Sequence, residues 1–124
     1  MNLVQEYFLL VNEVVLWRDT VYDGITAEKH NDKVKRMSTI AGEIERDFPD
    51  LKMDFLDLLS EDNEQIRMWV AHHMLECMNY EPVFRKQALK VIRHGARTDK
   101  MAPGYGEKVW LQEWYKTHPK DRWL

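Results

Sequence analysis

The stretch DNEQIRMWVAHHML, residues 62 to 75, decides how the rest of the sequence is interpreted. On an ideal helix of about 100° per residue, the following residues fall within one arc of about 100°: Ile66, Trp69, Val70, His73 and Cys77. His72 points about 100° away from this apolar stripe. The stretch therefore predicts a helix that carries His73 on its inward side and His72 outside it.

The two adjacent histidines raise the question of a metal site. Adjacent residues on a helix cannot both face one ion, so only His73 and Cys77 remain at a ligand spacing, which is half of a four-ligand zinc site. His30 or His94 would have to complete it through the tertiary structure. Because His and free Cys are often buried, we favour a core histidine and an inert thiol over a metal ligand or a nucleophile. We expect no metal and no cofactor.

Other signatures of catalysis do not occur in the sequence. It contains no GxSxG, HExxH, P-loop or GxGxxG motif. The GYG at residues 104–106 is too short to cradle a phosphate. An enzyme whose site is assembled from scattered residues remains a third alternative, behind two kinds of binding protein. We therefore expect a protein without catalytic residues.

Composition predicts one α-helical domain over residues 1–124. The chain is 44% hydrophobic and 31% charged, which suffices for a core and argues against disorder. The single Cys77 and the absence of a secretory signal pattern predict a cytoplasmic location. Polar residues interrupt the apolar segment LVQEYFLLVNEVVLW, so we expect no membrane span. A net charge of −3 disfavours nucleic acid as a partner.

Apolar residues recur throughout with the period of an α-helix, and no segment alternates for long enough to be a strand. A first helix over residues 3–17 is expected, and Gly24 separates it from a second. The later helix boundaries are predicted from capping and helix-breaking residues. Pro49 is expected to end the second helix, Asp50 to cap a third, and Asp62 or Asn63 to cap a fourth, while Pro82 and Gly95 are expected to bound a fifth. Residues 96–106 are expected to be irregular before a last helix. The fold class is therefore all-α, with antiparallel helix hairpins stacked as a short solenoid of about six helices.

Residues 51–95 resemble a HEAT-type repeat. The matching residues are Asp62 in the turn, Ile66, Arg67, Ala71 and Leu75 on the first helix, and Ala88, Leu89 and Ile92 on the second. Trp69 and Val70 depart from the pattern, where smaller residues are common. The closing GEKVWLQEW is similar to the last helix of a small bacterial family of uncharacterised HEAT-like domains. HEAT-like units are generally protein-binding scaffolds, so the resemblance implies binding.

The charges of the chain are segregated. Residues 43–64, here called the acidic segment, carry nine acidic residues against two basic ones. Residues 85–101, the basic segment, carry six basic residues against one acidic. The acidic segment is interpreted either as a solvated face with capping residues or as a docking face for a basic partner. Pairing between the two segments would remove the electrostatic basis of docking. The candidate partner-binding residues of the acidic segment are Asp50, Asp54, Asp57, Glu61, Asp62 and Glu64.

Apolar residues offer a second candidate surface. The stripe around Trp110 and Trp114 is interpreted as the packing face of the last helix. Trp123 follows Pro119 in a tail that need not reach the core, so it is also a candidate partner-binding residue. Leu9 and Leu16 fall on the polar side of the first helix, which is therefore either buried all round or a self-association surface.

These patterns lead us to expect a non-enzymatic module that binds another protein. The specific hypothesis is a bacterial immunity protein that neutralises a cognate toxin, with a basic toxin domain, such as a nuclease, as its partner. The alternative is a cytosolic adaptor or regulatory scaffold for a different protein. A small enzyme or metal-binding protein comes third.

Overall fold

A computed structural model describes residues 1–17, 24–98 and 102–124, and within these ranges the chain forms helices and no strands. The six α-helices are α1 (Leu3–Trp17), α2 (Gly24–Asp47), α3 (Lys52–Asp57), α4 (Glu64–Cys77), α5 (Pro82–Thr98) and α6 (Ala102–Thr117). Short 3₁₀ helices stand at three places: η1 (Pro49–Leu51), η2 (Leu58–Ser60) and η3 (Pro119–Trp123). The predicted all-α class is confirmed.

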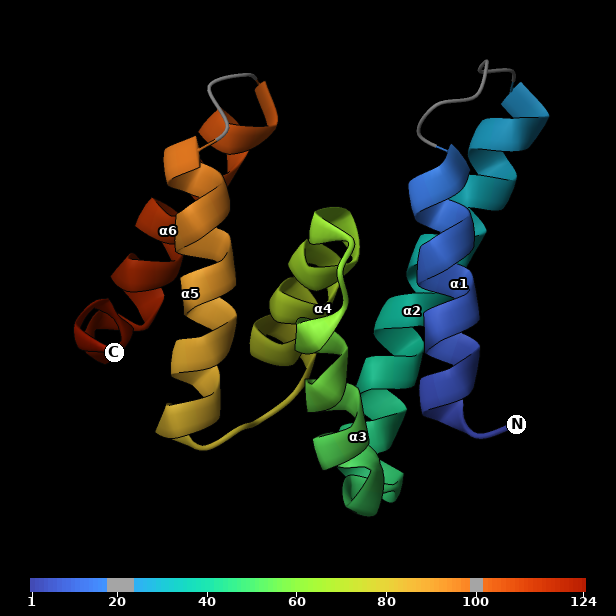
Figure 1. Ribbon diagram of the computed structural model, residues 1–124, viewed down its shortest axis with the longest axis horizontal. Helices are drawn as coiled ribbons and strands as arrows, with labels where there is room; N and C mark the ends of the chain where they lie inside the picture. Colours follow the sequence, from blue (N-terminus) through green and yellow to red (C-terminus); the bar gives the residue numbers. More distant parts are fainter. Residues whose placement is uncertain (18–23, 99–101) are drawn as a thin grey trace.

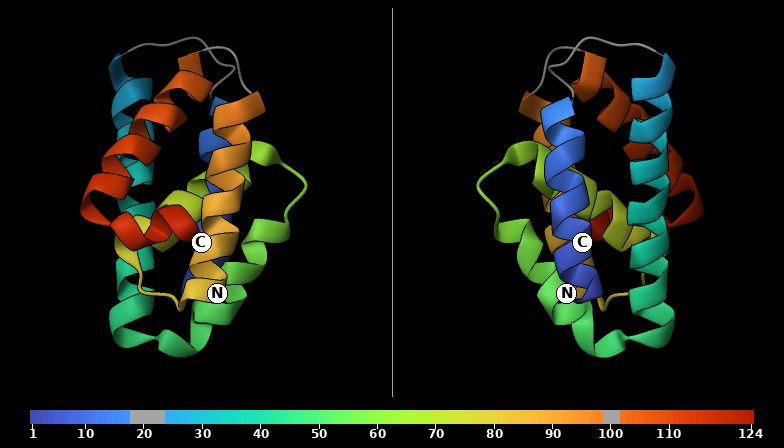
Figure 2. Two further views of the ribbon diagram at one scale, coloured as in Figure 1. Left: turned by 90° about the vertical axis from the view of Figure 1, so that its left-hand side faces the viewer. Right: turned by 90° about the vertical axis from the view of Figure 1, so that its right-hand side faces the viewer.

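Two antiparallel helix pairs form the ends of the molecule, and α4 lies between them (Figure 1). The first pair is α1 with α2, and the second is α5 with α6. Helix α4 contacts α5 on one side and both α1 and α2 on the other. In Figure 2, α6 and the C-terminal turn lie in front in the left view, and α1 lies in front in the right view, which is taken from the other end of the molecule. The surfaces of α1 and of η3 therefore belong to opposite ends of the protein.

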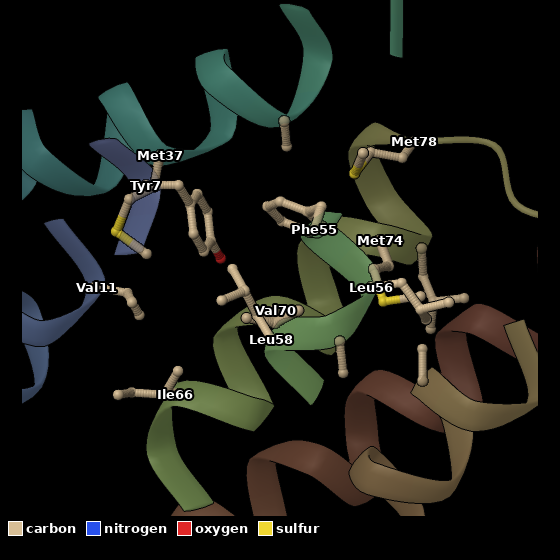
Figure 3. Close-up of a cluster of buried hydrophobic side chains, with 14 of the residues drawn as sticks. Tyr7, Val11, Met37, Phe55, Leu56, Leu58, Ile66, Val70, Met74 and Met78 are labelled. Atoms are coloured by element: carbon tan, nitrogen blue, oxygen red, sulfur yellow. The ribbon is translucent and has the colours of Figure 1, made fainter. Parts of the chain in front are cut away.

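Apolar side chains from both ends meet around α4 in a continuous core (Figure 3). Tyr7, Met37 and Phe55 are fully buried there, and the Tyr7 and Phe55 rings meet edge to face with centroids 4.7 Å apart. The core continues through α5, where Ala88, Leu89 and Ile92 are buried. Because α4 contributes buried side chains to both helix pairs, its orientation sets the relation between the two ends.

The predicted helix ends are partly right. Asn63 caps α4 by accepting a hydrogen bond from the Ile66 backbone N–H at 3.1 Å, and Pro82 is the first residue of α5. Asp50 was expected to cap the third helix, but it lies inside η1, and no side-chain cap bond is made there. Pro49 stands at the start of η1, where its fixed φ is accommodated.

Gly95 does not end α5, contrary to the prediction. The helix continues to Thr98, and Gly95 is buried against α4, where an added Cβ would lie 2.3 Å from Met68 Cε. Gly95 is therefore an internal helix residue that packs against the flexible end of the Met68 side chain, and it is not a C-cap. Residues 96–106 were expected to be irregular, yet most belong to α5 and α6, and residues 99–101 lie outside the described part.

The membrane question raised by α1 has a direct answer for the described residues. None of their helices combines the length and the apolar character that crossing a bilayer requires. Helix α1 instead buries Val4, Tyr7, Val11 and Val14 against the protein.

Candidate functional site

The acidic segment runs from the end of α2 through α3 to the start of α4. Asp50, Asp54 and Asp57 are exposed on η1 and α3, at the lower edge of the molecule in Figure 1. Phe55, Leu56 and Leu58 of the same stretch are buried. Burial of that apolar face orients α3 and turns its carboxylates to solvent. Glu61 is half-buried, while Asp62 and Glu64 are exposed at the start of α4.

The acidic segment divides into paired and unpaired carboxylates. Its paired members are Glu43 with Arg36 at 3.3 Å, Glu45 with Lys52 at 2.7 Å, Asp47 with Arg46 at 2.9 Å, and Glu64 with His94 at 4.0 Å. Lys52 and Arg46 are the only basic residues of the segment, and both are used within it. Within the described ranges, the following carboxylates form no ion pair: Asp50, Asp54, Asp57, Glu61 and Asp62.

The basic segment forms no described ion pair with these carboxylates, and two of its partly buried arginines, Arg85 and Arg93, bind the C-terminal turn instead. Arg85 pairs with Asp121, whose carboxylate also accepts a hydrogen bond from Trp114 Nε1 at 2.8 Å. The Arg93 guanidinium donates to the hydroxyl of Tyr115 at 2.8 Å. It also donates to the backbone oxygens of Asp121, at 2.9 Å, and Leu124, at 2.7 Å. In the described part of the chain, the one such contact between the two segments joins Glu64 to His94 at 4.0 Å, and it is an ion pair only when His94 is protonated. The five carboxylates thus carry negative charge that no described ion pair neutralises, although Arg67 donates to the backbone oxygens of Glu61 and Asp62.

An apolar groove lies beside the acidic segment, between α1 and η2. It has a volume of about 400 Å³ and is lined by Val4, Gln5, Phe8, Leu9, Leu58 and Glu61. Leu9 remains 52% exposed, and Leu16, two turns further on, is also exposed. Helix α1 is therefore not buried on all sides, because Leu9 and Leu16 are exposed to solvent. Glu61 is both a wall of the groove and a member of the acidic segment, so the two features form one surface.

The two histidines of α4 have different surroundings, as their spacing predicted. His73 is buried, its Nδ1 lies 2.6 Å from the Tyr7 hydroxyl, and its ring stacks on Trp69. Burial lowers the pKa of His73 to about 4, so the ring is neutral at pH 7. A neutral ring can accept the hydrogen bond that Tyr7 donates at Nδ1. The buried pair is thereby satisfied within the core.

His72 points away from the core, toward α6. Its Nε2 lies 2.7 Å from Glu107, its Nδ1 lies 3.6 Å from Glu76, and its ring meets Trp110 edge to face. Burial lowers the pKa of His72, but the bonds to Glu107 and Glu76 outweigh burial and raise it to about 9. The imidazolium at pH 7 therefore links α4 to the start of α6.

A cavity of about 350 Å³ opens beside the two histidines and is lined also by Trp69 and Glu107. Cys77 is half-buried, and burial raises the pKa of its thiol, which disfavours the reactive thiolate at pH 7. Among the residues that the structure describes, no three His, Cys, Asp or Glu side chains are grouped to hold a metal ion.

The aromatic end of the chain is divided as expected between packing and exposure. Trp110 and Trp114 are partly buried and stacked, with ring centroids 4.9 Å apart. Trp123 is 84% exposed, although it stands on the 3₁₀ turn that Arg85 and Arg93 anchor. It is therefore an exposed aromatic side chain on a fixed backbone.

Sequence reasoning missed the groove and the anchoring of η3. The groove had a signal, since Leu9 was out of place on the polar side of its helix. The bonds from Arg85 and Arg93 to η3 had none, because the partners are 28 to 36 residues apart and share no periodicity. In comparisons with known proteins, no family, no curated sequence and no solved structure matches this chain.

Proposed function

We propose that this protein is a non-enzymatic protein-binding module whose acidic segment docks a basic protein partner. The observation that carries the proposal is the set of exposed carboxylates on η1 and α3 that no described cation neutralises. The residues proposed to contact the partner are Asp50, Asp54, Asp57, Glu61, Asp62 and Glu64.

The acidic segment would attract a basic partner through its negative charge. Like charges held close together repel one another in the free protein, and a positively charged surface relieves that repulsion when it arrives. The same field raises the rate of encounter with a basic partner. The buried face of α3 fixes the positions of the carboxylates before binding, so little ordering is needed on association.

The biological setting that we propose is a bacterial immunity protein with a HEAT-like arrangement of helix hairpins. Such a protein folds in the cytoplasm and covers the active site or substrate surface of a basic toxin domain, for example a nuclease. The repeat-like residues of α4 and α5 and the antiparallel helix pairs support this arrangement. A basic partner that is no toxin would favour the adaptor alternative.

The experiment has two steps. The protein is first captured from its native cells with its bound partner, which mass spectrometry identifies. Purified partner is then bound to wild type and to a triple variant, Asp54→Lys, Asp57→Lys and Glu61→Lys. We expect the variant to fold, because Asp54 and Asp57 are exposed, Glu61 is half-buried, and none of the three forms a described ion pair. It should bind the partner at least about tenfold more weakly.

The controls reverse acidic residues outside the segment. Glu28 and Glu81 are exposed and suit this purpose, whereas Glu107 does not, because it bonds to His72. Reversal at Glu28 or Glu81 should change the affinity by less than about threefold. Equal affinity of the partner for wild type and for the folded triple variant would remove the acidic segment as the docking surface.

A further inference from the structure

The groove between α1 and η2 and the exposed tip of η3 are complementary in shape and charge. The groove is apolar inside, and the acidic residue that lines it, Glu61, belongs to the acidic segment. The tip presents the large apolar side chain of Trp123 beside a basic residue, Arg122. Each surface thus has the chemistry that the other lacks.

The basic character of the tip depends on where η3 directs its side chains. Asp121, the single acidic residue of residues 119–123, is buried and bound by Arg85 and by Trp114. Lys120 and Arg122 are exposed, and the Arg122 guanidinium lies 5.4 Å from the centroid of the Tyr115 ring. The outward surface of the turn therefore combines two cations with one indole.

A tip cannot reach the groove of its own chain, because the two surfaces lie at opposite ends of the molecule (Figures 1 and 2). A contact between them must join two molecules. We propose that the groove of one copy binds the Trp123 tip of a second copy, with Lys120 and Arg122 of the tip facing Glu61 of the groove and the acidic segment to which it belongs.

Burial of one indole in an apolar groove, surrounded by opposite charges, is the arrangement of an interface with a single anchor residue. The groove volume of about 400 Å³ is large enough for an indole side chain. The fixed backbone of η3 reduces the ordering that binding requires. Because different surfaces meet, the association is head to tail and continues from copy to copy unless the rotation closes a ring.

This association needs only the purified protein and is independent of the proposed partner. Sedimentation velocity from about 10 µM to about 1 mM covers the weak end of specific association. We expect the average mass of the wild type to rise with concentration and to fall again when salt is raised from about 50 mM to about 500 mM. A wild type that stays monomeric over this range would overturn the proposal.

Two variants disable one surface each. Leu9→Lys places a cation in the groove, and Trp123→Ala removes the anchor from the tip. Both positions are exposed, so both variants should fold like the wild type, as far-UV circular dichroism will verify. Each should lower the association constant at least about tenfold. Val109→Lys adds the same charge at an exposed position of α6 and should leave association unchanged.

Mixing the two disabled variants gives the decisive measurement. Leu9→Lys retains an intact tip, and Trp123→Ala retains an intact groove, so a one-to-one mixture should form a heterodimer that cannot grow further. A mixture that remains monomeric, or single variants that associate as strongly as the wild type, would overturn the head-to-tail contact. Equal loss of association in Val109→Lys would also overturn it, because a nonspecific charge effect would then explain the result.

Discussion

Adjacent residues of one helix can hold opposite protonation states when their neighbours differ, and His72 and His73 do so. His73 lies among apolar groups and is neutral at pH 7, since burial lowers its pKa to about 4. His72 lies between two carboxylates that raise its pKa to about 9. The rotation of about 100° between neighbouring residues on an ideal helix is enough to separate the two environments.

The first prediction concerns the bond between His72 and Glu107. The pKa of His72 is raised in the folded state, so its contribution is fully present below about pH 6.5 and is lost as the pH rises through about 9. Glu107→Gln should therefore lower the free energy of unfolding by about 1 to 2 kcal/mol at pH 6 and by much less at pH 10. Urea unfolding at both pH values measures the difference.

The control for this prediction is Glu113→Gln, which removes an exposed pair with Lys116 at 3.0 Å. Its effect should stay under about 0.5 kcal/mol at both pH values. A loss in Glu107→Gln that is as large at pH 10 as at pH 6 would show that Glu107 acts without the charge of His72.

At the scale of a residue, spacing predicted orientation but not partners. The inward position of His73 follows from its place on the apolar stripe of α4. Its hydrogen bond to Tyr7 does not follow, because the two residues lie 66 positions apart and the crossing of α1 with α4 brings them together. The same limit applies to Trp123, whose exposure was anticipated while its anchored backbone was not.

Helix boundaries in this chain depend on two kinds of signal. A side chain that bonds its own backbone, as Asn63 does at the start of α4, acts locally and is visible in the sequence. A glycine inside a helix, as Gly95 is where α5 packs against Met68, is placed by tertiary contact and gives no local signal of a helix end. Local pattern therefore located the start of α4 correctly and placed the end of α5 too early.

The second prediction tests the cap of α4. Asn63→Ala removes the acceptor for the Ile66 N–H and should lower the free energy of unfolding by about 1 kcal/mol, whereas Asn63→Asp, which retains an acceptor, should lose little. Asn31→Ala, at an exposed position inside α2, is the matched control and should be neutral or slightly stabilising, because Ala favours helix. Equal effects of Asn63→Ala and Asn31→Ala would argue against the cap.

The distribution of charge over the whole molecule follows from which charges the fold uses internally. Arg36 joins α1 to α2 through Glu6, at 2.7 Å, and Arg85 and Arg93 hold η3. These three arginines are therefore engaged in contacts within the protein. The carboxylates of α3 have no comparable role in the described structure, and they remain as a field at one edge of the protein.

The last prediction concerns that field and the partner of the proposed function. Long-range steering acts over roughly the screening length, which falls from about 14 Å at 50 mM salt to about 4 Å at 500 mM. The association rate of the wild type with a basic partner should therefore drop at least about tenfold between these salt concentrations, while the dissociation rate changes less. In the variant with reversed Asp54, Asp57 and Glu61, the rate should be slower at 50 mM and nearly independent of salt. Stopped-flow mixing measures these association rates. If the rates of the wild type and of the triple variant fell equally with salt, the steering charges would lie outside the acidic segment.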